Sequence, residues 1–366
     1  MSKDLRILYV DDDIENFNDL KDVLSGKTIN GYIITIDGEL DFEQAVARSK
    51  NYHLIILDLF KGNAMSGGAD KGSSVFNDIC SSIFVPIIFY SANPTSVAQL
   101  RSQVVGVANK LDDVSSLFSE IERLTKHNLP LLKEGVHGFI ENEFKKYFWE
   151  TIHQKKAMFK PESDDFSLGY MLLRNMADAL SRDNIRQILG DDSIKEDKVH
   201  PMEFYIYPTD TTKEFQTGEI LRHKENNNIY VVLTPSCDFI IRAKDHKRKV
   251  DYVLLLKTKL LTDTEEYSKY QNNKEKYADS LKQLINSDKG DRYFFLPQTP
   301  FIENRIIDFQ NKEIVSYEEL VNNFERIAKL DNPFAQSMAA TYARYYNRIG
   351  YPDIDSEYML SLIEQK

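Results

Sequence analysis

Alternation of short apolar segments with segments of helical spacing is the feature of the first 126 residues that most constrains the fold. The apolar segments lie at residues 6–10, 32–36, 54–57, 85–90 and 104–108. The segment Leu54–Leu57 is apolar at every position, as expected for a strand that is buried on both faces. Repeated strand–helix units place parallel strands side by side with helices on both faces. We therefore predict an α/β domain with a doubly wound, five-stranded parallel sheet.

Polar residues follow closely on four of these apolar segments, directly on three of them and after Asn109 on the last. They are Asp11 with Asp12, then Asp58, Ser91 and Lys110. Because parallel strands end at the same edge of a sheet, and α/β sheets bind their ligands at that edge, we expect these side chains to gather there.

Three carboxylates, a hydroxyl and a lysine at one edge indicate a particular chemistry. Carboxylates that lie close together repel unless a cation sits among them, and Mg²⁺ prefers such oxygen ligands. An aspartate beside Mg²⁺ can act as a nucleophile and form an acyl phosphate. The metal, the lysine and the hydroxyl would then neutralise the phosphoryl oxygens during transfer. The residue set therefore favours phosphoryl transfer onto an aspartate.

Four segments resemble the receiver domain of two-component response regulators. They read Ile-Leu-Tyr-Val-Asp-Asp at 7–12, Leu-Ile-Ile-Leu-Asp at 54–58, Pro-Ile-Ile-Phe-Tyr-Ser-Ala at 86–92 and Asn-Lys at 109–110. The resemblance covers about a third of the chain and implies a flavodoxin-like fold. It implies that Asp58 is the phosphoacceptor and a Mg²⁺ ligand, that Asp12 binds Mg²⁺ directly and Asp11 mainly through water, and that the Phe60 backbone carbonyl is a further ligand.

The same resemblance gives roles to the hydroxyl and the lysine, and three positions depart from it. Ser91 would hydrogen-bond the phosphoryl group and shift on activation, and Lys110 would pair with the phosphate. However, Leu111 stands where receivers usually have proline, Val107 stands where many have a switching aromatic, and the Gly-rich loop 61–72 is longer than usual. These are either tolerated variations or signs that phosphate is sensed differently, with participation of the loop.

Length, charge and cysteine content limit the classes of protein that remain possible. The chain has 366 residues, which suits two or three domains. Its net charge of −11 disfavours sequence-independent nucleic-acid binding, because an acidic surface repels phosphate backbones. Two distant cysteines form no disulfide framework and no Cys-rich zinc site. No apolar run approaches the length of a membrane span and no signal peptide begins the chain, so we expect a soluble, cytoplasmic protein without membrane contact.

We predict three regions: a receiver domain at 1–127, a helical linker or subdomain at 128–198, and an α+β output domain at 199–366. The output domain is expected to contain a small β-sheet or barrel followed by C-terminal helices. Residues 166–189 and 317–330 each read as one helix, judged by the spacing of their apolar residues.

The output region contains no trihelical unit with a basic recognition helix, so we expect no DNA binding. The basic run Arg242–Lys249 reads as a solvated hairpin loop rather than a contact for phosphate or an acidic partner. Cys237 reads as a small core residue, because the adjacent Asp238 would disfavour a reactive thiolate. The Tyr- and Arg-rich segment 342–352 suits either core packing or a protein interface.

These observations favour a response regulator that a histidine kinase phosphorylates on Asp58 with Mg²⁺, and that signals by protein–protein contacts. An alternative is a pseudo-receiver that docks partners without phosphorylation, within a phage-defence system that contains a GHKL-type ATPase. An enzyme in the C-terminal region is a further alternative, although no familiar catalytic motif is present. The sequence does not decide whether the protein forms a homodimer. It also does not decide whether residues 127–200 belong to a receiver dimer interface or to the output domain.

Overall fold

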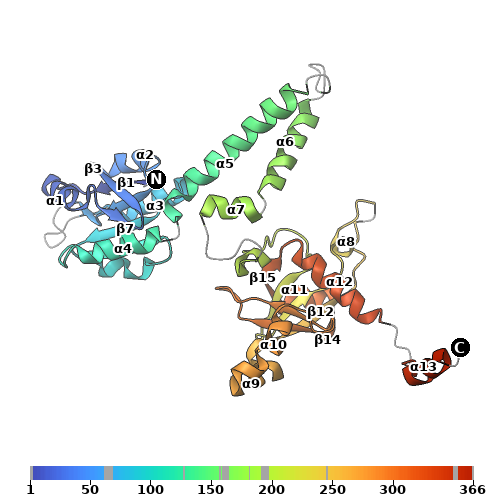
Figure 1. Cartoon of the computed structure of the whole chain (residues 1–366). Coiled ribbons are helices and arrows are strands. Elements are labelled where there is room, and N and C mark those ends of the chain that lie inside the picture. The colour runs from blue at the N-terminus through green and yellow to red at the C-terminus, as the bar shows by residue number, and fades with distance from the viewer. Residues whose placement is uncertain are drawn as a thin grey trace. The chain divides into compact units, whose positions relative to one another are not determined.

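The computed structural model describes residues 3–61, 69–126, 128–155, 158, 165–180, 182–190, 198–244, 246–348 and 353–364. The chain divides into two compact units, Met1–Ser193 and Ile194–Lys366, which are coloured blue to green and yellow to red in Figure 1. No helix among the described residues is long and apolar enough to cross a membrane.

The N-terminal unit is built on a mainly parallel sheet whose strands run in the order β2-β3-β1-β4-β7-β8. The strands are β1 (Lys3–Val10), β2 (Thr28–Ile29), β3 (Tyr32–Glu39), β4 (Leu54–Leu57), β7 (Ile87–Ser91) and β8 (Val105–Asn109). The neighbouring strands β3, β1, β4, β7 and β8 all pair in parallel, whereas β2 pairs antiparallel with β3. The predicted five-stranded sheet is therefore not confirmed. The sixth strand arises because Asn30 and Gly31 both take positive φ and turn the chain back within two residues.

Helices cover both faces of this sheet. They are α1 (Ile14–Leu24), α2 (Phe42–Ser49), α3 (Gly72–Ser82) and α4 (Ser115–Thr125). One core joins the sheet to α1 and α4, and a second core on the other face joins it to α2 and α3. The Asp13 side chain accepts a hydrogen bond from the Glu15 backbone N–H and so caps α1 directly after the first strand. The helix α1 therefore begins directly after the acidic residues 11–13.

A helical extension follows the sheet within the same unit. It comprises α5 (Leu132–Lys146), which continues as π-helical turns over Tyr147–His153, then α6 (Asp165–Ala179) and α7 (Arg182–Leu189). The helices α5 and α6 lie side by side in Figure 1 and contact each other. The prediction of one helix over 166–189 is wrong, because the helical segment ends at Ala179 and α7 begins at Arg182.

A histidine ties the start of α5 to the sheet. The backbone N–H of Arg6 donates to Nδ1 of the buried His53 at 3.1 Å, so Nε2–H is left to donate to Glu134 Oε1 at 2.7 Å. The Arg6 guanidinium also donates to Glu134, at 2.5 Å. The hydrogen bond from His53 is the main cause that lowers the pKa of Glu134; burial opposes it, and the positive charge of Arg6 adds a smaller lowering effect.

Replacing Glu134 by Ala should loosen α5 at its first turn. We expect the free energy of unfolding to fall by about 1 kcal/mol, because Glu134 accepts hydrogen bonds from His53 and Arg6 but is half exposed, and we expect the α5 amides to exchange faster. Because the folded pKa of Glu134 is lowered, its contribution is present above the ordinary carboxyl pKa and is lost as the pH falls through the lowered value. Hydrogen exchange at neutral and acid pH measures both effects. Equal protection in Glu134→Ala and in the exposed-site control Glu141→Ala would contradict this junction.

The C-terminal unit contains a seven-stranded antiparallel sheet in the order β13-β14-β12-β11-β10-β15-β9. Its strands are β9 (Tyr205–Ile206), β10 (Glu219–His223), β11 (Ile229–Val232), β12 (Tyr252–Leu260), β13 (Tyr293–Leu296), β14 (Arg305–Ser316) and β15 (Phe324–Leu330). The prediction of a helix over 317–330 is wrong in its second half. The helix α11 (Tyr317–Asn323) ends at Asn323, and β15 lies in the sheet between β10 and β9. Strand partners on both sides of β15 outweigh its local helical pattern.

Further helices accompany this second sheet: α8 (Ser236–Phe239), α9 (Glu265–Asn272), α10 (Lys274–Ile285) and α12 (Phe334–Tyr346). The helix α13 (Ser356–Glu364) follows in the chain, and its residues are exposed. Tyr345 of α12 is buried and packs near Phe309, so this part of the Tyr-rich segment belongs to the core. Residues 349–352 lie outside the described residues. Cys237 is exposed in α8, which corrects its expected core position. The basic run is mostly exposed, and its Arg248 pairs with Glu214 at 2.9 Å.

Candidate functional site

The register of the parallel strands brings the predicted residues to one edge of the N-terminal sheet. Val10 pairs with Leu57, and Leu57 in turn pairs with Phe89. The residues that follow these strands therefore end side by side, as the strand-end argument predicts. The backbone N–H of Lys110 donates to the carbonyl of Ser91 at 3.0 Å and extends the pairing of β8 with β7 by one residue.

Lys110 bridges the two carboxylates at this edge. Its Nζ lies 2.7 Å from Asp58 Oδ2 and 2.5 Å from Asp11 Oδ2. All three side chains are largely removed from solvent, with exposed fractions of 15% for Lys110, 13% for Asp58 and 1% for Asp11. Burial by itself lowers the pKa of Lys110, but the charges and hydrogen bonds of Asp58 and Asp11 outweigh it and raise the pKa overall. The lysine therefore stays an ammonium at neutral pH.

Asp11 has further partners that the sequence argument did not include. The hydroxyl of the buried Tyr9 donates to Asp11 Oδ2, and the backbone N–H of Asp13 donates to Oδ1 at 2.9 Å. Asn16 Nδ2 approaches Oδ2 at 3.3 Å. Burial, together with the negative charges of Asp11 and Asp58, raises the pKa of Tyr9, so its hydroxyl remains a neutral donor. The sequence does indicate that Tyr9 lies beside Asp11, because side chains two residues apart on a strand point to the same side.

Close backbone packing fixes the position of Asp58. Its N–H donates to the Val10 carbonyl at 2.9 Å, and its Oδ1 accepts from the Leu59 N–H at 2.7 Å. The first residue of α3, Gly72, lies so near that a Cβ there would be 2.3 Å from the Asp58 carbonyl oxygen. A glycine is needed at this position because no side chain fits against that backbone.

The other predicted site residues lie around this cluster. Ser91 ends β7 and is buried, whereas Asp12 is exposed directly after Asp11. Phe60 begins a short two-stranded ladder in which it pairs with Asp70. Residues 62–68 of the predicted long loop lie outside the described residues. The cluster thus joins Asp11, Asp58 and Lys110 through direct contacts.

The donor set at this edge can be compared with what Mg²⁺ requires. The Asp11 and Asp58 carboxylates converge on a single cation, the Lys110 ammonium, and carboxylate oxygens are also the ligands that Mg²⁺ prefers. No group of three or more His, Cys, Asp or Glu side chains within the described ranges is arranged to hold a metal ion. The Mg²⁺ ligand set expected from the sequence therefore stays a prediction, and Lys110 already occupies oxygens of Asp11 and Asp58 in this structure.

No family model matches this chain, and no curated protein matches it. Solved structures that are similar to about a third of the chain include response regulators. A two-component transcriptional regulator AraC from Clostridium phytofermentans ISDg is 18% identical, with 36% of this chain and 98% of that chain covered and a TM-score of 0.27. The Vibrio cholerae chemotaxis protein CheY4 is 19% identical, with 33% and 98% covered and a TM-score of 0.25.

A LuxR-family two-component response regulator from Aurantimonas sp. SI85-9A1 is also 19% identical. Here 32% of this chain and 81% of that chain are covered, with a TM-score of 0.25. These matches concern receiver-type structures and leave the larger part of the chain without a counterpart.

Proposed function

We propose that the N-terminal unit is a receiver of the two-component type and accepts a phosphoryl group on Asp58 from a histidine kinase or a related GHKL-type ATPase partner. The observation that carries this proposal is the bridge from Lys110 to both Asp58 and Asp11 at the strand-end edge. A nucleophilic carboxylate and a fixed cation at hydrogen-bond distance are the elements that aspartyl phosphorylation needs.

In the proposed reaction, an Asp58 carboxylate oxygen attacks the phosphorus of a phosphohistidine. A P–O bond forms, the P–N bond breaks, and the imidazole leaves and takes up a proton. The Lys110 ammonium is placed to neutralise the phosphoryl oxygens, and the Ser91 hydroxyl would hydrogen-bond one of them. Asp11, Asp12, Asp58 and the Phe60 carbonyl would hold Mg²⁺, which when bound supplies further charge neutralisation. Added charge at Asp58 would reorganise the strand-end loops.

The proposed output is contact with other proteins through the C-terminal unit rather than binding to DNA. The net charge of −11 supports this, because it opposes a phosphate backbone. A steep dependence of DNA affinity on salt concentration, measured with the full chain, would contradict this proposal.

Phosphorylation can be tested directly with acetyl phosphate and MgCl₂. We expect the wild-type chain to gain the mass of one phosphoryl group as an acid-stable, base-labile adduct, and Asp58→Ala to gain none. Asp78→Ala, which changes an exposed aspartate of α3, is the matched control and should be modified like the wild type. The proposal fails if no phosphodonor modifies the wild type, or if Asp58→Ala is modified equally.

The arrangement around Asp11 also favours a second candidate function. Lys110 and Tyr9 both bond to Oδ2 of Asp11, and the Asp13 N–H bonds to Oδ1, so the carboxylate is well satisfied without a metal. This favours a pseudo-receiver that docks a partner, for example in a GHKL-linked defence system, without phosphorylation. Partner affinity that is the same for the wild type and Asp58→Ala, with or without acetyl phosphate, would select this candidate over the first.

A further inference from the structure

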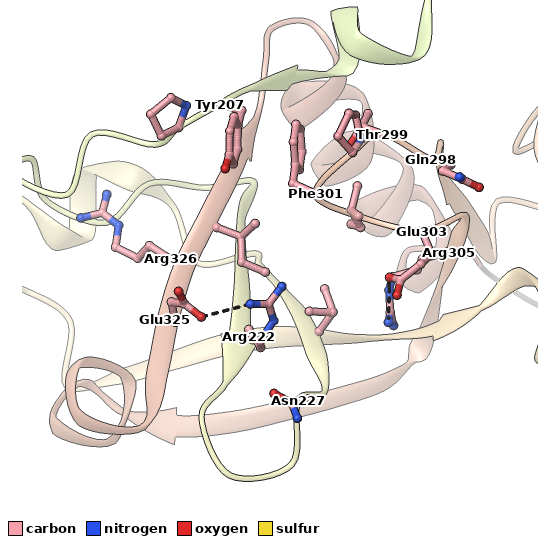
Figure 2. A pocket seen from close by; sticks show the side chains of 15 residues that line it. Tyr207, Arg222, Asn227, Gln298, Thr299, Phe301, Glu303, Arg305, Glu325 and Arg326 are labelled. Atoms are coloured by element: carbon pink, nitrogen blue, oxygen red, sulfur yellow. Dashed lines mark hydrogen bonds and ion pairs between the residues drawn. The ribbon is translucent and has the colours of Figure 1, made fainter. Parts of the chain in front are cut away.

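The C-terminal unit has a cavity of about 810 Å³ on one face of its sheet, shown in Figure 2. Its lining comes from strands β10, β11, β14 and β15, from Tyr207 and Pro208 after β9, and from the loop between β13 and β14. The volume falls in the range of small-molecule sites, which is about 300–1,000 Å³. The cavity lies in the C-terminal unit, which does not contain Asp11, Asp58 or Lys110, so the proposed phosphorylation does not explain it.

One part of the lining suits a flat, apolar group. Ile229, Ile302 and Ile327 line the cavity and are buried in the core beneath it. The rings of Tyr207 and Phe301 are stacked, with centroids 4.2 Å apart and planes within 4° of parallel. Tyr207 is 56% exposed, so this stack still presents aromatic surface to a ligand. Planar bases stack on such side chains.

A second part of the lining is cationic. Figure 2 draws the ends of Arg222 and Arg305 below the aromatic pair. Arg305 is only 12% exposed, and its Nη1 donates to Thr258 Oγ1 at 3.1 Å, while its contacts with Glu303 are long at 3.4 Å. Two or more of its N–H donors are therefore weakly engaged, since a guanidinium carries five.

The carboxylates beside these arginines are held loosely. Glu303 is 68% exposed, and Glu325, which lies 3.2 Å from Arg222, is 59% exposed. Because both carboxylates stay largely in solvent and contact the arginines at 3.2–3.4 Å, their pairs contribute little to stability, and a ligand anion can replace them at small cost. Arginine pairs with phosphate through two parallel hydrogen bonds, which favours that exchange.

Two further observations bear on the assignment. Arg326 also lines the cavity, but its Nε and Nη2 donate to the two carboxylate oxygens of Glu219, at 2.7 and 2.5 Å. Its role is therefore structural. In contrast, the buried Thr299 hydroxyl has no hydrogen-bond partner among the described residues. Thr299 lines the cavity, but its hydroxyl oxygen is buried away from solvent, so the hydroxyl offers no contact to a ligand in this structure.

We propose that this cavity binds a nucleoside monophosphate or a ligand of the same chemistry, with its base against the Tyr207–Phe301 stack and its phosphate between Arg222 and Arg305. A bare phosphate would leave the aromatic surface unused, and a neutral aromatic compound would leave the two arginines unused. A ligand that joins a planar base to an anion uses both parts of the lining.

Calorimetric titration of the full chain tests the proposal. The probes are AMP, GMP, CMP and UMP, with ribose 5-phosphate and adenosine as the two halves. We expect at least one nucleotide to bind about tenfold or more tightly than either half. Arg222→Gln and Arg305→Gln should each weaken it about ten- to one hundredfold, and Tyr207→Leu about five- to one hundredfold. Arg344→Gln, an exposed arginine of α12 outside the cavity, should bind like the wild type.

Glu325→Gln should change nucleotide affinity in the opposite direction. It removes the carboxylate that competes for Arg222, so it should tighten nucleotide binding severalfold. Arg222 is exposed enough that its replacement should leave the fold intact, and thermal melting checks Arg305→Gln. The proposal is overturned if no nucleotide binds at about 1 mM, if ribose 5-phosphate binds as tightly as the nucleotides, or if Arg222→Gln and Glu325→Gln both bind like the wild type.

Discussion

Replacing Lys110 by Met is expected to lower the free energy of unfolding of the N-terminal unit by about 3–5 kcal/mol at neutral pH. The substitution keeps most of the apolar stem of the side chain but removes the charge that, among the described residues, bridges Asp11 and Asp58. Both carboxylates are largely buried, so they would repel each other without a cation between them. The pKa of Lys110 is raised, so its contribution is complete below the ordinary lysine pKa and is lost only as the pH rises through the higher folded value.

Urea unfolding of the wild type and Lys110→Met, with and without Mg²⁺, measures this effect. If Asp11 and Asp58 bind Mg²⁺, the metal should recover part of the lost stability in the variant, and it should stabilise the variant more than the wild type. Lys146→Met, which removes the exposed i,i+3 partner of Glu143, should unfold like the wild type. Wild-type stability of Lys110→Met would mean that the buried bridge does not form in solution.

The strand-end cluster could be predicted from the sequence because it depends on one general property of parallel sheets. Asp11, Asp58 and Lys110 each follow an apolar strand, and the parallel register alone brings them together. Tyr9 was missed although the two-residue period of the same strand places it beside Asp11. The edge strand β2 was missed as well, although Asn30-Gly31 between apolar residues is a strong hairpin signal.

Other features have no comparable local signal. In β15, Phe324, Ile327 and Ala328 are spaced as on one face of a helix, and pairing with β10 and β9 decides the outcome. The cavity of the C-terminal unit brings together Tyr207 and Phe301, which lie far apart in the chain. Such an arrangement depends on the order of the strands, which the pattern of a single sequence does not specify in an antiparallel sheet.

Arg326→Met is expected to have a similarly large effect on the C-terminal unit. The guanidinium of Arg326 holds Glu219, which is 1% exposed, through two hydrogen bonds, and it lies 4.6 Å from the centre of the Phe215 ring. Removing one partner of a buried ion pair leaves the other charge unpaired, which costs about 3–5 kcal/mol. The loss should appear as a lower midpoint of urea unfolding at neutral pH, with the slope unchanged.

The pH dependence of this loss separates charge from packing. Burial raises the pKa of Glu219 although Arg326 opposes the rise, and without Arg326 the pKa should rise further. A raised folded pKa means that the contribution of this group to stability is complete below the ordinary carboxyl pKa and is lost as the pH rises through the folded value. The difference between wild type and Arg326→Met should therefore be largest at neutral pH and shrink toward about pH 5 as Glu219 binds a proton.

Two comparisons check the assignment of this effect to the buried charge. Arg222 pairs with Glu325 across the same two strands, but both side chains are far more exposed, so Arg222→Met should cost at most about 1 kcal/mol. Adding Glu219→Gln to Arg326→Met should recover part of the loss, because the unpaired charge is then gone. A loss that is independent of pH and is not relieved by Glu219→Gln would instead assign the role of Arg326 to its packing on Phe215.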